Sequence, residues 1–292
     1  MQTDNPRGIA AMSAAMAVFV VNDALMKYTT ETLPVAQSIF VRGVLVTTLV
    51  LAVAGAQGQL RYWRTLFHPA VLARGALEAV GSFTYIATLV HIPLAIALAI
   101  NMSTPLVIIP FAVLLLSEKV GWRRWSALVA GFIGVLLIVQ PGVGGMNWWA
   151  VLAFASTFVF ALRDVNTRRI PARIPSLLVT AASAALIGLV AGAIVLVQGW
   201  QPMGGNHVAA LAGAAILVGI GMQWLVIATR IAEATVVAGF RYTALLWGVI
   251  IGYLVWGDLP GALAWWGIAL LIGAGLYASH RERIRHRMAM GK

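Results

Sequence analysis

The chain contains no cysteine, and only 10% of its 292 residues are charged. Without cysteine it has no disulfide framework, no thiolate metal site and no thiol nucleophile. Acidic side chains are especially scarce, with nine Asp and Glu against 20 Lys and Arg. Long polar stretches are also missing, so no segment is predicted to form a soluble domain or a low-complexity linker. These absences exclude small disulfide-stapled proteins and thiol-based enzymes.

Apolar residues take the place of the missing polar ones. They make up 61% of the chain, and the mean hydropathy is +0.91, far from the composition of soluble proteins. A helix needs about 20 apolar residues to cross the hydrocarbon layer of a membrane. The sequence therefore predicts an all-α integral membrane protein with ten transmembrane helices. The predicted spans lie near residues 8–27, 35–55, 70–90, 94–117, 124–140, 148–169, 176–198, 208–231, 235–257 and 262–280.

The basic residues predict the orientation of these spans. If the N-terminus is placed inside, every Lys and Arg except Lys27, Arg42 and Arg241 falls in an inner segment or the basic tail. Cytoplasmic loops carry such an excess of Lys and Arg. We therefore predict a multi-pass protein of the bacterial inner membrane with both termini in the cytoplasm. Orientation explains the formal charge of +11 better than binding to nucleic acid does, and the expected partners are membrane lipid and a small-molecule substrate.

The second half of the chain repeats features of the first at an offset of 140 or 141 residues. Asp23, Lys27, Pro34, Glu118 and Trp125 recur as Asp164, Arg168, Pro175, Asp258 and Trp265. Each half holds an odd number of predicted spans, so the second half enters the membrane from the opposite side. The sequence thus predicts two inverted five-helix repeats, 1–141 and 142–292, around a central cavity. Inverted repeats are common in alternating-access transporters.

Several of these features resemble one known family. They are Asp23-x3-Lys27 with Pro34, Gln37 and Arg42; Pro93-x11-Pro105-x12-Glu118; Phe240-Arg241-Tyr242 with Trp247; and Gly257-Asp258-x-Pro260. The pattern is similar to that of ten-helix bacterial transporters of the drug/metabolite transporter superfamily, in the EamA branch. The resemblance extends over essentially the whole chain. The family that it points to includes the aromatic amino-acid exporter group. It implies that two inverted repeats surround a central cavity, with the fifth and tenth helices at the periphery.

Charged residues inside spans are the first candidates for function, because they normally face a partner or a wet cavity. Asp23 and Lys27 are four residues apart and can pair along one helix. With Arg42 they form a candidate gating or ion network. Asp164 and Arg168 repeat the Asp–Lys pair near the inner surface. A structural role in tying helices together is the favoured interpretation, and a direct role in gating or coupling is the alternative.

The fourth span contains two predicted helix kinks. Pro105 lacks an N–H group and crowds the carbonyl of Asn101, which predicts a free backbone acceptor beside the Asn101 amide. Pro110 breaks a second helical hydrogen bond, and the second half lacks both prolines. We therefore expect the fourth span to bend more than the ninth. Arg241 occupies the position in the second half that matches Asn101, and the two are predicted to bracket a central solute.

Other candidate substrate-binding residues lie on spans that should line the cavity. Glu78 is the only carboxylate well inside a span, so it is the first candidate if a proton is the coupling ion. It is expected to pair with Arg241, with Arg74, or with the substrate. The remaining candidates supply hydroxyl, amide or aromatic groups: Ser82, Tyr85, Gln223, Trp224 and Tyr242. For the aromatic residues, packing against lipid or helices is the competing interpretation.

The motifs that are missing from the sequence distinguish among a transporter, an intramembrane enzyme and a channel. The sequence has no metalloprotease motif, nucleophile elbow or phosphate-binding Walker motif, which argues against an intramembrane enzyme and against ATP hydrolysis. A filter loop typical of channels is also missing. We therefore predict a secondary transporter without metal or cofactor that exports small amphipathic metabolites, most plausibly amino acids. Uptake of a nucleoside-like or vitamin-like solute is the alternative, and the sequence leaves substrate, direction, coupling ion and oligomeric state open.

Overall fold

Long helices account for nearly all of the computed structural model. It describes residues 5–116, 121–140, 147–167, 169–171, 173–231 and 239–290, and no β-strand occurs among them. The helices are α1 (Asn5–Thr30), α2 (Val35–Ala56), the 3₁₀ helix η1 (Gln59–Phe67), α3 (Pro69–Leu89), α4 (Leu94–Asn101), α5 (Thr104–Leu116), α6 (Trp122–Val139), α7 (Trp148–Thr167), α8 (Ser176–Gln198), α9 (Gly205–Ile231), α11 (Thr243–Trp256) and α12 (Ala262–Met290). The chain is therefore an all-α membrane protein.

Six segments of the described chain are long and apolar enough to cross a membrane. They are Pro6–Thr30, Val35–Ala56, Leu94–Leu115, Trp148–Thr167, Ser176–Gln198 and Gly205–Leu225. Three shorter apolar segments are Trp125–Val139, Thr243–Trp256 and Ala262–Ala278. The polar side chains of α3, among them Arg74 and Glu78, lower its hydropathy. The helices coincide with much of every predicted span, whereas the count of ten crossings stays a prediction.

Two predicted spans are interrupted at matching positions. The fourth is divided by a turn at Met102–Ser103 between α4 and α5, two residues before Pro105. The ninth has a turn at Arg241–Tyr242, directly before α11. No proline lies at this second turn, so proline is not required for the interruption. Pro110 lies within α5 without ending it, and the relative bend of the two spans stays a prediction.

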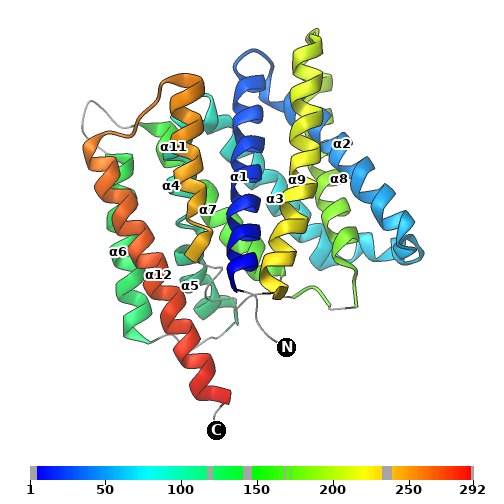
Figure 1. Ribbon diagram of the computed structural model, residues 1–292. Helices are drawn as coiled ribbons and strands as arrows, with labels where there is room; N and C mark the ends of the chain where they lie inside the picture. The colour runs from blue at the N-terminus through cyan, green and yellow to red at the C-terminus, as the bar shows by residue number, and fades with distance from the viewer. Residues whose placement is uncertain are drawn as a thin grey trace.

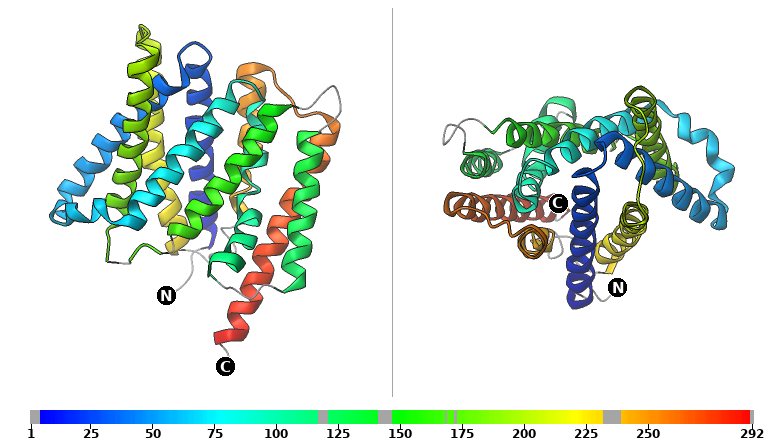
Figure 2. Two further views of the ribbon diagram at one scale, coloured as in Figure 1. Left: turned by 180° about the vertical axis from the view of Figure 1, so that it is seen from behind. Right: turned by 90° about the horizontal axis from the view of Figure 1, so that it is seen from above.

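Helices from the two halves of the chain pack against each other in pairs. α1 packs on α9, α2 on α8, α3 on α7, α4 on α11 and α6 on α12. Figure 1 shows α6 and α12 side by side at one edge of the bundle, and the view from above in Figure 2 shows α1 and α9 on the side opposite α7. The core thus lies between helices that are far apart in sequence.

Two aromatic contacts illustrate how these pairs are related. A methyl group on Gly81 of α3 would lie 2.6 Å from the Phe160 ring of α7, and one on Gly221 of α9 would lie 2.8 Å from the Phe19 ring of α1. Gly81 and Gly221 are 140 residues apart, and Phe19 and Phe160 are 141 apart. The α3–α7 and α1–α9 contacts therefore use equivalent residues of the two halves.

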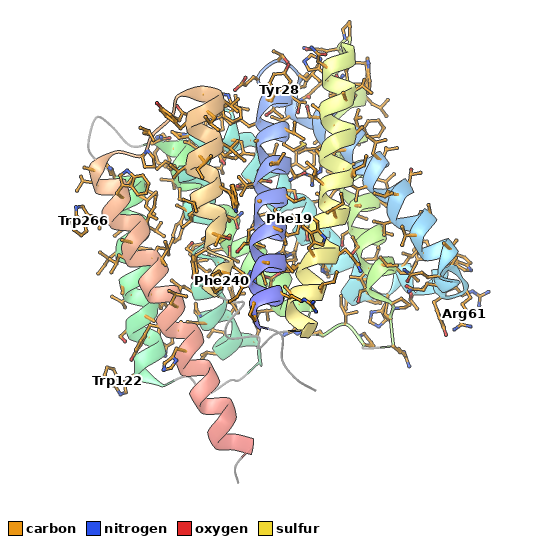
Figure 3. The ribbon with its side chains drawn as sticks, in the orientation of Figure 1. Phe19, Tyr28, Arg61, Trp122, Phe240 and Trp266 are labelled. Carbon is orange, nitrogen blue, oxygen red and sulfur yellow. The ribbon has the colours of Figure 1, made fainter. Side chains whose placement is uncertain are left out.

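The bundle has two distinct ends. α1 begins and α12 ends at the same one, which we call the terminal end; the other is the distal end (Figure 1). Arg61 of η1 lies at the terminal end, and Trp122 and Trp266 project from the α6–α12 pair away from the bundle (Figure 3). Both tryptophan side chains are more than two-thirds exposed, as suits residues that meet lipid and its interface.

Candidate substrate and gating site

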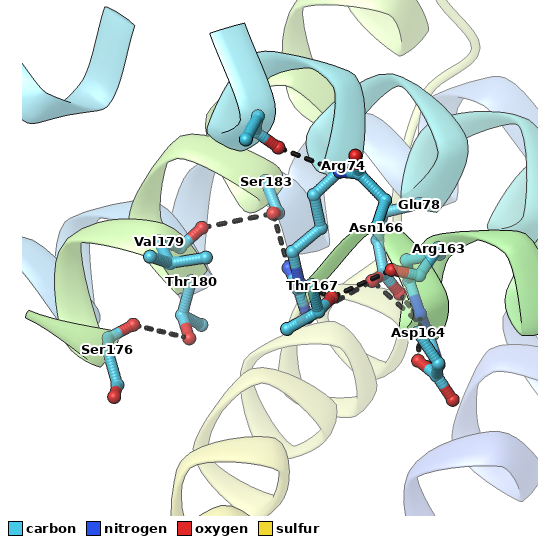
Figure 4. Close-up of polar contacts among 11 residues, drawn as sticks. Arg74, Glu78, Arg163, Asp164, Asn166, Thr167, Ser176, Val179, Thr180 and Ser183 are labelled. Carbon is cyan, nitrogen blue, oxygen red and sulfur yellow. Dashed lines mark hydrogen bonds and ion pairs between the residues drawn. The ribbon is translucent and has the colours of Figure 1, made fainter. Parts of the chain in front are cut away.

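An ion cluster joins α3, α7 and α8 near the terminal end. The Nη1 atom of Arg163 lies 3.0 Å and 3.2 Å from the two carboxylate oxygens of Glu78, and Nη2 of Arg74 lies 3.6 Å from Oε2 of Glu78. Arg163 also donates to the Asp164 carboxylate, with Nη2 2.6 Å from Oδ1. Figure 4 shows these side chains converging between the three helices.

The same cluster is completed by hydroxyl groups. Arg74 donates from Nη1 to Ser183 of α8 over 2.6 Å and from Nε to Thr167 of α7 over 3.0 Å. The Glu78 and Arg163 side chains retain only 19% and 20% exposure. Paired, hydrogen-bonded charges of this kind are expected for a framework that ties helices together. The Arg74–Glu78 pair expected from spacing is present, with Arg163 as a second partner, and no ion pair between Glu78 and Arg241 occurs among the described residues.

A second polar cluster lies in the distal half, between α1, α2 and α3. The Asn22 amide donates to Oδ1 of Asp23 over 2.9 Å and accepts a hydrogen bond from Nη1 of Arg42 over 3.3 Å. The Tyr85 hydroxyl donates to Oδ2 of Asp23 over 3.1 Å. The predicted network of Asp23 and Arg42 is thus bridged by Asn22 and does not form a direct ion pair.

The two clusters occupy equivalent positions in the two halves. Asn22 and Asp23 of α1 correspond to Arg163 and Asp164 of α7, at an offset of 141 residues. The position equivalent to Arg42 is Ser183, which binds Arg74. The placement is therefore symmetric, whereas the chemistry differs: ion pairs dominate at the terminal end, and neutral donors surround Asp23.

Lys27 does not pair with Asp23, in contrast to the prediction from their spacing. Its ammonium group donates to the Ile92 carbonyl over 2.8 Å and lies 5.1 Å from the centre of the Trp256 ring. The Trp256 indole in turn donates to Glu31. Lys27 is only 5% exposed, so its ammonium group needs a hydrogen-bond acceptor within the protein. The Ile92 carbonyl of the α3–α4 loop supplies this acceptor, and the Asp23 carboxylate, one turn back along α1, does not.

These contacts connect several helices at the distal end. Lys27, Ile92 and Trp256 join the end of α1 to the α3–α4 loop and the end of α11. The Gln37 amide exchanges two hydrogen bonds with the backbone of Gln201, at 2.8 Å and 2.9 Å, and so joins α2 to the α8–α9 loop. Contacts that span both halves at one end are what a gate requires.

The interrupted spans expose polar groups next to the core. The Thr104 hydroxyl donates to the Asn101 carbonyl over 2.6 Å, so the predicted free backbone acceptor is already satisfied. The Asn101 side-chain amide makes no hydrogen bond with the described residues and is partly exposed. Ser103 donates to the Ile100 carbonyl, and the equivalent Thr243 donates to that of Phe240, each over 2.6 Å. Arg241, at the second turn, is exposed.

The remaining predicted site residues are scattered. Tyr85 is 6% exposed and joins the Asp23 cluster, and Ser82, one turn before it on α3, is 9% exposed. Tyr242 directs its hydroxyl against Gly275 of α12. Gln223 and Trp224 lie exposed on α9. Arg168 and Glu118 lie outside the described residues.

Two contributors were missed from the sequence. From the sequence, Arg163 is one of the unnamed basic residues of the inner segments, although its position beside Asp164 near the end of a span is a signal for ion pairing. Asn22 carried no comparable signal, because a lone amide next to a carboxylate is common in any helix. Its role depends on α2 bringing Arg42 to it, which spacing along α1 does not reveal.

Comparison with known proteins adds an independent observation. The profile described as the EamA-like transporter family matches residues 6–140. A riboflavin transporter of Rhizobium johnstonii is 31% identical over 216 residues, which are 74% of this chain and 72% of the relative. An S-adenosylmethionine uptake transporter of Rickettsia prowazekii is 23% identical over 94% of this chain and 93% of its own length.

Two further matches bear on direction and fold. A pseudopaline exporter of Pseudomonas aeruginosa is 29% identical over 57% of this chain and 58% of the relative. One crystal structure, 19% identical in sequence, superimposes with a TM-score of 0.64 over 94% of this chain and 98% of that protein. The relatives thus include proteins named for uptake and for export.

Proposed function

Because this chain belongs to the EamA-like transporter family, we propose that it carries a small heteroaromatic solute of the vitamin or nucleoside class across the bacterial inner membrane by alternating access. That it is a multi-pass membrane transporter and not an enzyme follows from the family. The observation that carries the mechanism is the matched interruption of the fourth and ninth predicted spans. Broken helices at mid-membrane are typical of transporter binding sites.

The proposal assumes that the two halves form inverted five-helix repeats divided near residue 141. The cross-half helix pairs support this, since α1 on α9 and α3 on α7 use equivalent glycine and phenylalanine positions. A symmetric carrier then has two gates of similar construction. We assign Lys27 and its partners to the distal gate, and the Arg74, Glu78, Arg163 and Asp164 cluster to the terminal one.

Between the gates, Asn101 and Arg241 remain candidates for solute contact. Neither side chain takes part in the contacts that hold the helices together. The Asn101 amide has no hydrogen-bond partner in the described part of the chain, and Arg241 is exposed. Riboflavin and S-adenosylmethionine, for which two relatives are named, both join a fused nitrogen heterocycle to a hydroxylated five-carbon unit, an open chain in the first and a ribose ring in the second. This shared chemistry favours the vitamin- or nucleoside-like solute over the amino acids predicted from the sequence.

The orientation inferred from charge belongs to the same proposal. With α1 starting in the cytoplasm, the terminal end faces inward and the distal end faces outward. The terminal end then carries the exposed Arg61 and Arg64 of η1. This agrees with the enrichment of Lys and Arg on the cytoplasmic side of membrane proteins.

Counterflow in proteoliposomes tests the proposed function. Vesicles containing purified protein are loaded with unlabelled riboflavin, S-adenosylmethionine or phenylalanine, and entry of the same labelled solute is followed. We expect saturable exchange of riboflavin or S-adenosylmethionine and none of phenylalanine. Exchange of phenylalanine alone would favour amino-acid transport, and equal passage with and without internal solute would indicate a channel.

A further inference from the structure

The Asn22 cluster holds two opposite charges apart by one amide group. Asn22 accepts from Arg42 through its oxygen and donates to Asp23 through its nitrogen. Electrostatic attraction in a medium of low dielectric constant favours direct contact between a guanidinium and a carboxylate. Their separation therefore leaves both groups with hydrogen-bonding capacity that the framework does not use.

That unused capacity is considerable. A guanidinium has five N–H donors, and Arg42 makes one hydrogen bond of 3.3 Å to the described residues. Among the described residues, the Asp23 carboxylate accepts from Asn22 and Tyr85 only, although it has about four lone-pair positions. Asp23 and Arg42 also stay partly exposed, whereas Asn22 and Tyr85 are 5% and 6% exposed. Both charged residues therefore keep some accessible surface beside the buried amide and phenol.

The equivalent cluster of the second half is different. Arg163 stands where Asn22 does and contacts Asp164 and Glu78 directly. Its donors are thus occupied by carboxylates, and its guanidinium also lies 4.7 Å from the Phe160 ring. Of the two guanidinium groups, Arg42 is therefore the one whose donors the described residues leave mostly unused.

One aromatic residue belongs to the Asn22 cluster, and a second ring packs against it. Tyr85 of α3 bonds to Asp23, and its ring meets the Phe160 ring of α7 edge-on with centroids 6.3 Å apart. A flat heterocycle bound at Asp23 would therefore have Tyr85 as an aromatic neighbour. Ligand sites commonly combine such apolar walls with a few polar groups that fix orientation.

We propose that Asp23 and Arg42 recognise a lactam or imide edge, O=C–N–H, of the transported solute. The solute carbonyl accepts from Arg42, and its N–H donates to Asp23, which reproduces the bridge that Asn22 makes beside it. The pyrimidinedione ring of riboflavin presents this edge at N3. The assignment rests on the proposed function and deepens it. A zwitterionic amino acid would use the same two charges through separate carboxylate and ammonium groups, and is the competing occupant.

Competition against riboflavin counterflow tests the edge directly. Riboflavin and 3-methylriboflavin, which lacks the N3–H, are compared as competitors on the wild-type protein, with phenylalanine as a third competitor. Loss of a hydrogen bond to a charged group corresponds to about a ten- to hundred-fold loss of affinity. We expect 3-methylriboflavin to compete at least tenfold less well than riboflavin, and phenylalanine not to compete.

The Asp23→Asn variant tests whether the Asp23 carboxylate is the group that accepts the hydrogen bond from N3–H. Riboflavin should bind this variant about tenfold less tightly, and the penalty for N3 methylation should disappear. Thr48→Ala, an exposed position on the same helix as Arg42, should retain both the affinity and the penalty. If Asp23→Asn is not recovered folded, the wild-type comparison of the two flavins decides by itself.

The possible outcomes distinguish recognition of the imide edge by Asp23 and Arg42 from transport of the solute itself. Riboflavin exchange with equal competition by both flavins overturns the imide-edge assignment and leaves riboflavin transport standing. Competition by phenylalanine assigns the charges to a zwitterion and also overturns the edge. Exchange of S-adenosylmethionine without riboflavin overturns the edge and leaves the proposed function standing, because adenine has no O=C–N–H group. If neither solute is exchanged, the proposed function and the edge fail together.

Discussion

Replacing Arg163 with methionine is expected to lower the free energy of unfolding by about 3 kcal/mol. Removing one partner of a buried ion pair typically costs about 3–5 kcal/mol, because the remaining charge is left uncompensated. The lower end of this range applies because Glu78 retains Arg74, at 3.6 Å. The Glu78 and Arg163 side chains, 19% and 20% exposed, are too enclosed for solvent to screen the loss. Equilibrium unfolding in lipid–detergent micelles measures the change.

Two further variants show whether the loss comes from the ion pair. Arg61→Met removes an arginine from an exposed position of η1 and should change stability by no more than about 0.5 kcal/mol. Glu78→Gln combined with Arg163→Met should be more stable than Arg163→Met alone, because Glu78 is then neutral and only the more exposed Asp164 carboxylate has lost its partner. A double variant at least as unstable as the single one would mean that the packing of Arg163 on Phe160 matters more than its charge.

A methyl group at Gly267 is expected to separate α6 from α12. It would lie 2.5 Å from the carbonyl oxygen of Gly134 and 3.0 Å from the amide nitrogen of Ile138. Both are backbone atoms, so a side-chain rotation cannot relieve the clash. Overpacking of this kind typically costs about 1–3 kcal/mol, and close helix packing in membranes depends on small residues at such contacts. The unfolding midpoint of Gly267→Ala in micelles should fall accordingly.

The matched control lies on the same helix. A methyl group on Gly273 meets no atom of the described chain within 4 Å, and this residue is exposed. Gly273→Ala should be neutral or slightly stabilising, because alanine favours helix by about 1 kcal/mol over glycine. Equal destabilisation by Gly267→Ala and Gly273→Ala would show that the α6–α12 contact is not the cause.

Helix positions could be predicted well from the sequence because they depend on local hydropathy. The Arg74–Glu78 pair was also accessible, since residues four apart meet on one helix face. The same rule failed for Asp23 and Lys27, whose partners lie on other elements: Tyr85 for the first and the Ile92 carbonyl for the second. Spacing gives the pairs that can form, and tertiary packing decides which do.

The turn at Arg241–Tyr242 marks another limit. Proline signals an interruption in the fourth span, but the ninth is interrupted without one. The Thr243 hydroxyl bonds to the Phe240 carbonyl, as Ser103 does to Ile100. A hydroxyl at this position was visible in the sequence, yet the same bond also forms inside unbroken helices. The interruption therefore follows from the fold around it and not from a local signal.

The inverted repeat is tested most directly at Gly121 and Gly261. They are equivalent residues, each exposed, each with open space for a side chain, and each just before a helix of the α6–α12 pair. Because the native chain has no cysteine, single Gly121→Cys and Gly261→Cys variants can be labelled in intact cells with a membrane-impermeant thiol reagent. The account predicts labelling of Gly261→Cys from outside, and labelling of Gly121→Cys only after the membrane is opened. Labelling of both variants from the same side would contradict the inverted arrangement on which the transport mechanism depends.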